Sequence, residues 1–400
     1  MFTYTRKVFK MKILHVVPSF VPCYSHGGVV NASYQIAKKQ AENGHDVTVY
    51  TTDSCQERLK FEDNYNVDVD GIKVYYFKNI SNTFKNKATI DTPISLINHL
   101  KKNISDFDII HIHEHRHSLA IATHRYARKN NIPYVLQAHG SVLPFFQKEK
   151  LKEIFDKFWG FDILHDACKV FALTEIEREQ YLKMGVSDEK IEIVPLGINL
   201  DEYNDLPKRG SFKSKYNINS DDKLILFLGR IHEIKGLDLL VKSFNQISNQ
   251  NVKLAIVGGD SGFKGELEKL IDSLGLNNRI IFPGVLTGND KREALVDCDI
   301  FVMPSKYESF TTSGLEAMAC SKPLILSENN HIHTWVKDNV GLISKYDEND
   351  LAKCFERLLN DEKLCNEFGE KGRQLIENKY DWNKVVGQIE KIYENCIVQY

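Results

Sequence analysis

Short apolar runs rich in β-branched residues alternate with amphipathic segments along almost the whole chain. Runs of this length are typical of buried strands, and the segments between them have helical spacing. The first half predicts strands at 12–17, 46–51, 72–77, 108–113, 133–138, 169–173 and 191–194, and helices near 29–43, 94–104, 118–130, 148–166 and 175–184. This rhythm predicts a parallel sheet with helices on both faces.

The rhythm restarts after residues 206–222, a polar and turn-rich segment that we interpret as a linker. The second half predicts strands at 223–228, 253–257, 279–282, 299–303 and 323–326, and helices near 236–248, 264–274, 290–297, 312–320, 349–360, 361–379 and 383–398. We therefore expect an α/β chain with two doubly wound, Rossmann-like domains, 1–205 and 206–380. Ligands of such sheets bind beyond the carboxyl ends of the strands, so we expect both domains to face one cleft.

Composition narrows the class of protein. The chain has 400 residues, of which 42% are hydrophobic and 26% charged, as in a soluble globular protein of two domains. A net charge of −2 argues against a general nucleic-acid binder. No apolar run is long enough to span a membrane, and residues 1–10 lack the apolar core of a secretory signal. Met11 directly precedes the first strand, so the start at Met1 or Met11 stays open.

The cysteines give no sign of a metal site. The eight residues are scattered, with no C-x-x-C pair and no zinc-ligand spacing. We therefore expect reduced, buried thiols in a cytoplasmic protein.

The segment 305–323 carries the most informative chemistry. Two carboxylates, Glu308 and Glu316, flank a predicted strand-to-helix junction. The residues between them that suit a tight turn and a helix N-cap are Ser309, Thr311, Thr312, Ser313 and Gly314. A helix N-terminus suits phosphate, and carboxylates accept hydrogen bonds from hydroxyls, so the segment fits a nucleotide-sugar. The alternative is a capped core helix with two solvated carboxylates.

Three further loops follow predicted strands. Arg230 and Lys235 come after 223–228, where two cations could stabilise a departing diphosphate; the alternative is two surface cations. Gly27 and Gly28 precede a helix and would let a ligand approach the backbone, although this signal alone is weak. His139 ends another strand, where an imidazole could bond a sugar hydroxyl, although a lone histidine is more often structural.

Two motifs point to chemistry that we do not favour. His111, His113, His115 and His117 would share one face of an extended strand, which raises the question of zinc. Ligands so close along one strand rarely complete a tetrahedron, so we predict no metal site. The glycines in 257–262 do not fit G-x-G-x-x-G, and an NAD enzyme is therefore poorly supported.

Residues 143–164 combine aromatic residues, among them Phe145, Phe146 and Trp159, with lysines. Such a segment could contact anionic lipid or a lipid-linked acceptor. We favour the alternative, a helix that buries its aromatic face in its own domain.

Taken together, these residues resemble the family-4 retaining glycosyltransferases, also called glycosyl transferases group 1, which have the GT-B fold. The resemblance extends from Met11 to about Val398. Its most specific part is the Glu-x7-Glu signature from Glu308 to Glu316, followed by EAMA at 316–319 and by Pro323. The segment 380–382 resembles the step after which the family's last helix returns to the first domain, so residues 381–400 are expected there.

The resemblance implies roles for individual residues. Glu308 would contact the donor sugar and Glu316 the ribose, while backbone groups around Phe310, Thr311 and Thr312 would meet the diphosphate and sugar. Arg230 and Lys235 match the phosphate-binding pair. Gly27 and Gly28 match the glycine loop near the diphosphate, and His139 matches the first-domain histidine near the reacting sugar. Thr311 stands where the family commonly has glycine, and Ser321 departs from the common glycine before the proline.

The implied function is transfer of a hexosyl group, with retention, from a nucleotide-sugar to an acceptor hydroxyl in glycan or polysaccharide biosynthesis. The expected partners are the nucleotide-sugar and a glycan or lipid-linked acceptor, without a cofactor or metal. The expected location is the cytoplasm, with peripheral contact at the inner face of the membrane as an option. Alternatives are another GT-B enzyme, such as a nucleotide-sugar epimerase or a glycan phosphorylase, and a non-catalytic nucleotide-sugar binder.

Overall fold

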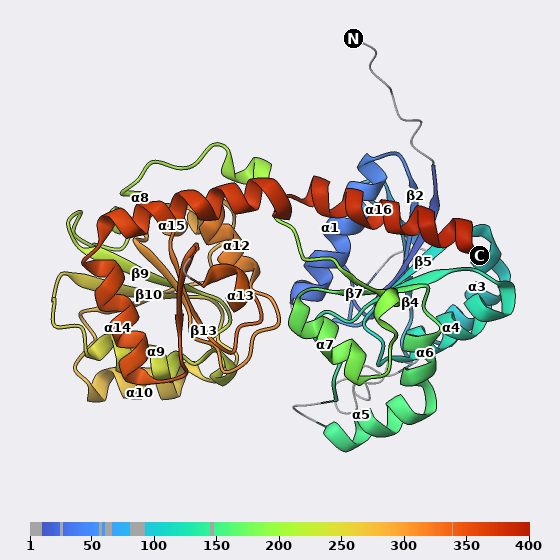
Figure 1. Cartoon of the computed structure of the whole chain (residues 1–400), viewed down its shortest axis with the longest axis horizontal. Coiled ribbons are helices and arrows are strands. Elements are labelled where there is room, and N and C mark those ends of the chain that lie inside the picture. The colour runs from blue at the N-terminus through green and yellow to red at the C-terminus, as the bar shows by residue number, and fades with distance from the viewer. Residues whose placement is uncertain are drawn as a thin grey trace, which may run out of the picture. The chain divides into compact units, whose positions relative to one another are not determined.

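The structure, a computed structural model, describes residues 10–24, 27–55, 58–60, 66–80, 93–144, 148–337 and 339–400. The chain forms two compact units (Figure 1). Unit 1 comprises Met1–Pro195 and Trp382–Tyr400, and unit 2 comprises Leu196–Asp381.

The domain boundary predicted from the sequence, after residue 205, falls inside unit 2. Residues 206–222 are not a plain linker, because they contain helix α8 (Ser211–Lys215), whose Phe212 is buried.

The described part of unit 1 contains an eight-stranded sheet in the order β3-β4-β2-β1-β5-β6-β7-β8. Its strands are β1 (Lys12–Val16), β2 (Asp46–Thr52), β3 (Asn66–Val69), β4 (Ile72–Phe77), β5 (Ile109–His113), β6 (Tyr134–Gln137), β7 (Lys169–Ala172) and β8 (Ile191–Ile193). Every neighbouring pair is parallel except β3 and β4, so the predicted parallel sheet is confirmed. Strand β3, which the sequence pattern did not predict, is a short edge strand whose side chains are partly or fully exposed.

The α-helices in the described part of unit 1 are α1 (Gly28–Glu42), α3 (Ile94–Asn103), α4 (Ser118–Asn130), α5 (Glu149–Phe155), α6 (Phe161–His165), α7 (Glu175–Lys183) and α16 (Trp382–Gln399), with a π-helical turn at Asp156–Gly160 between α5 and α6. Helix α16 packs against α1 and β5 (Figure 1), which confirms that the last helix returns to the first domain. Its Tyr393 is fully buried, and Gln388 donates a hydrogen bond to the carbonyl of Ile193 over 2.9 Å.

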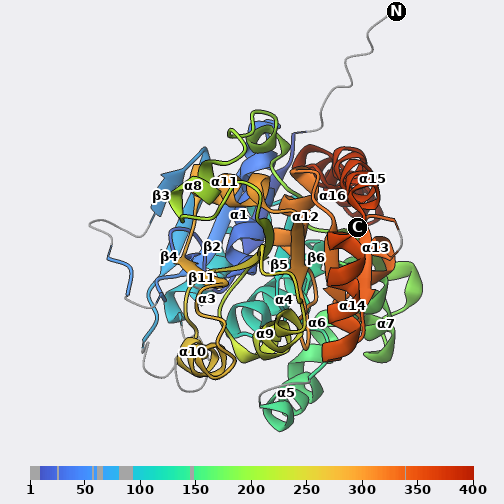
Figure 2. The same cartoon turned by 90° about the vertical axis from the view of Figure 1, so that its left-hand side faces the viewer.

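The described part of unit 2 contains a six-stranded parallel sheet in the order β11-β10-β9-β12-β13-β14. Its strands are β9 (Lys223–Leu228), β10 (Val252–Val257), β11 (Ile280–Gly284), β12 (Ile300–Met303), β13 (Leu324–Ser327) and β14 (Gly341–Ser344). Its longer helices are α9 (Leu237–Asn245), α10 (Lys264–Ser273), α11 (Gly288–Asp297), α12 (Thr312–Ala319), α14 (Glu348–Leu359) and α15 (Glu362–Leu375), and α13 (His333–Val336) is a single turn. Helix α9 packs against both α10 and α14, and Figure 2 shows it between them.

Both sheets have a topological switch point, where successive strands begin to be added on the opposite side of the first strand. The switch lies between β1 and β5 in unit 1 and between β9 and β12 in unit 2. Loops that follow these strands diverge to opposite faces of the sheet and leave a crevice at the carboxyl edge. The loops that carry most of the candidate residues follow β1, β9 and β12.

The backbone geometry of the loop after β10 explains why residue 258 is glycine. Its backbone has φ of +149°, and a Cβ atom there would lie 1.8 Å from the carbonyl oxygen of Gly229, just beyond β9. Only glycine permits this approach between the ends of two neighbouring strands. The glycines of 257–262 therefore need no dinucleotide to explain them.

The expectation of eight reduced cysteines is wrong for four of them. Disulfides join Cys23 to Cys55 and Cys168 to Cys396, while Cys298, Cys320, Cys354 and Cys365 are free. The first bridge links loops after the neighbouring strands β1 and β2, and the second links the residue before β7 to α16. The paired cysteines are 32 and 228 residues apart in the chain, so no local sequence pattern indicates either pairing. The cysteines thus lend no support to a reducing compartment.

Within the described ranges, no helix is both long and apolar enough to cross a membrane.

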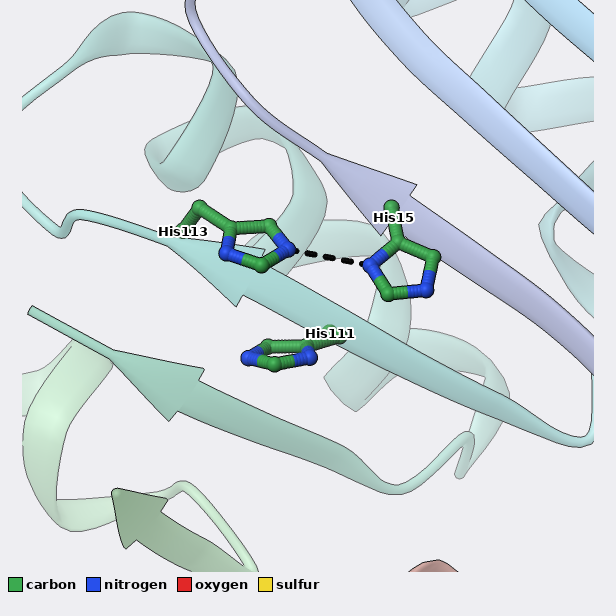
Figure 3. Close-up of side chains that lie close together, drawn as sticks. All are labelled: His15, His111 and His113. Carbon is green, nitrogen blue, oxygen red and sulfur yellow. Dashed lines mark hydrogen bonds between the residues drawn. The ribbon is translucent and has the colours of Figure 1, made fainter. Parts of the chain in front are cut away.

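The core of unit 1 holds an unusual polar cluster at the switch point. His15 on β1 and His111 on β5 are register partners, and His113 lies two residues further along β5 (Figure 3). All three side chains are fully buried. Burial lowers the pKa of His15 to about 4, and lowers the pKa values of His111 and His113 well below the ordinary 6.5. The core therefore contains neutral imidazoles at neutral pH.

We expect unit 1 to lose stability as the pH falls from about 7 to about 5. The unfolded chain takes up protons near pH 6.5, whereas the buried rings stay neutral until the pH is much lower, so protons favour the unfolded state. Each such histidine contributes a slope of about 1.4 kcal/mol per pH unit in this window. Urea unfolding at several pH values should show this fall.

A matched pair of variants tests the cause. His111→Gln should reduce the pH dependence by about one proton. The matched control is His124→Gln, at a histidine of α4 that lies outside the buried cluster. Equal stability of the wild-type protein at pH 7 and pH 5 would contradict neutral burial of the cluster.

Candidate active site

Two loops of unit 2 meet beyond the switch-point strands β9 and β12. The first contains a short 3₁₀ turn, Glu233–Lys235, and ends at Gly236. Gly236 has φ of +67°, and a Cβ atom on it would lie 2.1 Å from the carbonyl oxygen of Pro304, which follows β12. Glycine therefore lets the loop after β9 lie directly against the loop after β12.

This contact brings Lys235 and Glu308 together. The ammonium group of Lys235 donates a hydrogen bond to Oε2 of Glu308, and both side chains are largely buried, at 15% and 13% exposure. The backbone of Glu308 is held by a neighbouring loop, since its N–H donates to Asn329 and its carbonyl accepts from His331. Two residues that sequence analysis singled out separately thus form one ion pair on a fixed backbone.

Helix α12 begins four residues after Glu308. The hydroxyl of Thr311 accepts a hydrogen bond from the N–H of Gly314 over 3.2 Å and so caps the helix. No described residue accepts a hydrogen bond from the backbone N–H of Thr312 or Ser313. Thr311, which replaces the glycine common in the family, therefore serves as the N-cap and leaves two amides for a ligand. Phe310 is buried edge-on against Trp335, and Ser309 completes the turn.

Glu316 lies in the second turn of α12 and has its own partners. Its Oε1 accepts a hydrogen bond from Lys291 on α11 over 2.6 Å. Burial raises the pKa of Tyr203, and the charge of Glu316 raises it further. Sequence analysis gave neither Lys291 nor Tyr203 a role at this site, since no local pattern links either residue to residue 316.

Arg230 completes the candidate residues of unit 2. It follows β9 and Gly229, and its side chain is exposed. Its guanidinium group forms no ion pair or hydrogen bond with any residue that the structure describes. Lys235, in contrast, already forms an ion pair with Glu308.

The remaining candidate residues lie in unit 1. Gly27 precedes α1 with φ of +84°, and Gly28 is the first residue of the helix. A Cβ atom on either glycine would meet nothing within 4 Å, so the space beside this helix start is open to a ligand.

His139 follows β6 in a loop that is firmly held. Its backbone has φ of 53°, an uncommon conformation for a residue other than glycine. The N–H of the next residue, Gly140, donates to the buried carboxylate of Glu177 over 2.6 Å. Burial raises the pKa of Glu177 to about 7. Arg116 donates to the carbonyl of Val142 over 2.7 Å and also pairs with the buried Asp156.

The histidines of 108–118 separate into two groups. Strand β5 ends at His113, and Glu114 has φ of 62°, so the backbone turns and His115 and His117 leave the shared face. His117 instead caps α4, accepting from the N–H of Ala120. The prediction of four histidines on one face is therefore wrong.

Among the described residues, the nitrogen atoms of His15, His111 and His113 lie close enough to hold a metal ion, all within 4.8 Å of one another. The ring orientations do not favour this. His111 and His113 are stacked with centroids 4.1 Å apart and planes 24° from parallel, so their nitrogen lone pairs point alongside one another instead of converging. The absence of a metal site stays a prediction.

Most of the aromatic segment of unit 1 is exposed, contrary to the interpretation that we favoured, and only Phe155 of the described aromatic residues at 155, 158 and 159 packs against the core. Leu151, Ile154, Phe158, Trp159 and Phe161 are between 39% and 63% exposed. Phe145 and Phe146 lie outside the described residues. The π-helical turn at Asp156–Gly160 buries Asp156 against Arg116 and directs Phe158 and Trp159 outward. Beside Trp159 lies a pocket of about 560 Å³, whose lining includes Arg125, Arg128 and Lys129.

Two family models match the chain, and together they cover most of it. Glycosyltransferase Family 4 matches residues 26–202, and Glycosyl transferases group 1 matches residues 208–375. An uncharacterized glycosyltransferase of Methanocaldococcus jannaschii is 22% identical over 96% of this chain and 98% of its own length. The mannosylfructose-phosphate synthase of Agrobacterium fabrum is 21% identical over 92% of this chain and 86% of its own.

Solved structures share the fold. Sucrose-phosphate synthase of Thermosynechococcus elongatus has a TM-score of 0.77 and 20% identity, covering 98% of this chain and all of that one. The HepE protein of Anabaena, solved in complex with UDP-glucose, has a TM-score of 0.74 and 18% identity over 96% of this chain and all of its own. Neither the fold neighbours nor the relatives favour an epimerase, a phosphorylase or a non-catalytic binder. The chain belongs to the family-4 glycosyltransferases of the GT-B fold and is an enzyme that transfers a sugar from a nucleotide-sugar donor.

Proposed function

We propose that unit 2 binds the nucleoside diphosphate part of the donor at the end of β9 and the start of α12. The observation that carries this proposal is the Lys235–Glu308 pair beside the capped start of α12. A diphosphate carries negative charge that suits both the free amides of Thr312 and Ser313 and the positive end of the helix. The exposed Arg230 is a second cation for the same group.

Bond breakage explains why cations are needed here. As the bond between the sugar C1 and the phosphate oxygen breaks, its electron pair goes to the phosphate and the sugar becomes oxocarbenium-like. Arg230 and Lys235 stabilise the growing negative charge, in the place that a divalent metal takes in other enzymes. The acceptor oxygen bonds to C1 and gives up its proton, for which the departing phosphate oxygen is a base. We propose no covalent nucleophile, and we expect the anomeric configuration to be retained.

The carboxylates have separate roles in this proposal. Glu308 holds Lys235 in place and accepts hydrogen bonds from sugar hydroxyls. Glu316, held by Lys291, accepts hydrogen bonds from the ribose. In unit 1, Gly27 and Gly28 leave room for the diphosphate, and His139 bonds a hydroxyl of the transferred sugar.

The exposed aromatic face of unit 1 suggests where the acceptor comes from. We propose that the face formed by Leu151, Ile154, Phe158, Trp159 and Phe161 contacts a membrane with anionic lipids, and that the acceptor is a lipid-linked glycan. Apolar side chains at this position bury surface in the interface, and Lys150 and Lys157 on the same segment attract anionic headgroups. The pocket with Arg125, Arg128 and Lys129 adds positive charge next to Trp159.

Replacing Lys235 with alanine should reduce kcat by about 10²- to 10³-fold, because a preorganised charge at the leaving group is removed. The free energy of unfolding should fall by about 3 kcal/mol, because removing one partner of this largely buried pair leaves the Glu308 carboxylate without its cation. Steady-state kinetics and thermal unfolding measure the two effects. The control is Lys242→Ala, which removes a surface pair with Glu348. Near-normal transfer by Lys235→Ala would exclude the leaving-group role.

Glu316→Gln should weaken nucleotide binding by about 10- to 100-fold and leave kcat at saturating donor nearly unchanged. The reason is the loss of a charge-assisted hydrogen bond, worth about 1.5–3 kcal/mol, to the ribose. Calorimetric titration with UDP, GDP and ADP measures the affinity. Glu293→Gln on α11 is the control, since Glu293 accepts a hydrogen bond from Asn289 on the same helix at the surface. An unchanged affinity for the preferred nucleotide would contradict the ribose role.

The double variant Phe158→Ser/Trp159→Ser should reduce binding to phosphatidylglycerol-containing vesicles by at least about tenfold, since each tenfold corresponds to about 1.4 kcal/mol of lost burial. Binding should also fall with added salt. Vesicle co-sedimentation measures both. Val285→Ser removes an equally exposed apolar side chain from unit 2 and should have no effect. Equal sedimentation of wild type and double variant would refute contact through this face.

A further inference from the structure

A line of side chains in the core of unit 1 connects Gln40 on α1 to His139. Nε2 of His15 lies 2.7 Å from Oε1 of Gln40, and Nδ1 of His15 lies 2.9 Å from Nε2 of His113. Nδ1 of His113 lies 3.0 Å from Nε2 of His139. Each of the two intermediate rings thus uses both nitrogen atoms, one toward each neighbour (Figure 3 shows the contact between His15 and His113).

The direction of these hydrogen bonds follows from the first contact. The oxygen of Gln40 can only accept, so Nε2 of His15 carries a proton. A neutral ring has one N–H, which leaves Nδ1 of His15 as an acceptor and requires an N–H at Nε2 of His113. The same reasoning passes the requirement to His139, whose Nε2 must donate to Nδ1 of His113. Burial, which lowers the pKa of His139 to about 3, keeps these rings neutral.

The end of the line is open to a ligand. His139 is only partly buried, and its Nδ1 forms no hydrogen bond with a residue in the described part of the chain. Its backbone is fixed independently through Gly140 and Glu177. Rotation of the ring would break the bond to His113, so both the position and the protonation of the exposed nitrogen are set from inside the protein.

We propose that Gln40, acting through His15 and His113, holds His139 in the Nε2–H tautomer, so that its Nδ1 lone pair faces the substrate and accepts a hydrogen bond from a hydroxyl group. Gln40, His15 and His113 are positioning residues. This inference deepens the proposed role of His139 and rests on it for the identity of the hydroxyl. The tautomer itself depends only on unit 1.

The tautomers can be observed directly. In protein labelled with ¹⁵N-histidine, long-range ¹H–¹⁵N correlation spectra distinguish Nε2–H from Nδ1–H rings. His15, His113 and His139 should all show the Nε2–H pattern, assigned by single His→Gln variants of each. An Nδ1–H pattern at His139 in the wild-type protein would overturn the proposal without any variant of Gln40.

Gln40→Met tests the origin of the effect. It keeps the volume of the side chain and removes the acceptor. The spectrum of His139 should change from a single tautomer to a mixture, and kcat for sugar transfer should fall about tenfold or more, since a misplaced proton leaves the substrate hydroxyl unpaired. Gln180→Met, which alters another buried glutamine of unit 1, should change neither quantity. An unchanged His139 spectrum in folded Gln40→Met would show that Gln40 does not set the tautomer.

Two results separate this inference from the proposed function. If His139 shows the Nε2–H tautomer but His139→Phe transfers sugar normally, the tautomer control stands and the substrate role fails. Metal analysis of the purified protein tests the competing possibility, that His15, His111 and His113 hold a metal ion. One equivalent of zinc that is lost in His111→Asn would overturn the proposal, because a metal requires lone pairs where the hydrogen-bonded line requires N–H groups.

Discussion

The approach of Gly236 to the carbonyl of Pro304 is the constraint on which the candidate donor site of unit 2 depends. Parallel pairing of β9 with β12 brings the ends of these strands together, but a Cβ atom at residue 236 would lie only 2.1 Å from the carbonyl oxygen of Pro304 and would force the loops apart. Glycine removes that separation, and Lys235 then reaches Glu308. A cation, a carboxylate and a helix start are thereby gathered at one edge of one sheet, where charge can be stabilised before a ligand arrives.

Unit 1 uses the same topology for a different purpose. At its switch point it buries imidazoles where an ordinary α/β sheet has Val, Ile or Leu. Neutral rings in the core reduce stability at low pH, and unpaired buried atoms such as Nε2 of His111 have a desolvation cost. The fold tolerates this cost because the remaining core is large and apolar. The hydrogen-bonded side chains from Gln40 to His113 support the partly buried His139 without placing charge in the sheet.

Much of the fold was predictable because the strands are buried on both faces and read as apolar runs. Strands β3 and β14 were missed because one is exposed at an edge and the other begins with glycine and spans four residues. The pairing of Lys235 with Glu308 was within reach, since both follow central strands of one sheet. The contact of Glu316 with Lys291 was not, because no local pattern marks a surface lysine of α11. The outward direction of Phe158 and Trp159 depends on a π-helical turn that shifts the helical register, which periodicity alone does not reveal.

The bridge between Cys168 and Cys396 has a topological consequence. Residues 169–395, which include the whole of unit 2, lie between the two cysteines, so sulfur closes this part of the chain into a covalent ring. Unit 2 is then an insertion with two tethers, and cutting either connection would not release it from unit 1 while the bond persists. Helix α16 closes this ring, because it carries Cys396. Reducing the disulfide opens the ring and leaves α16 held to unit 1 by non-covalent packing alone.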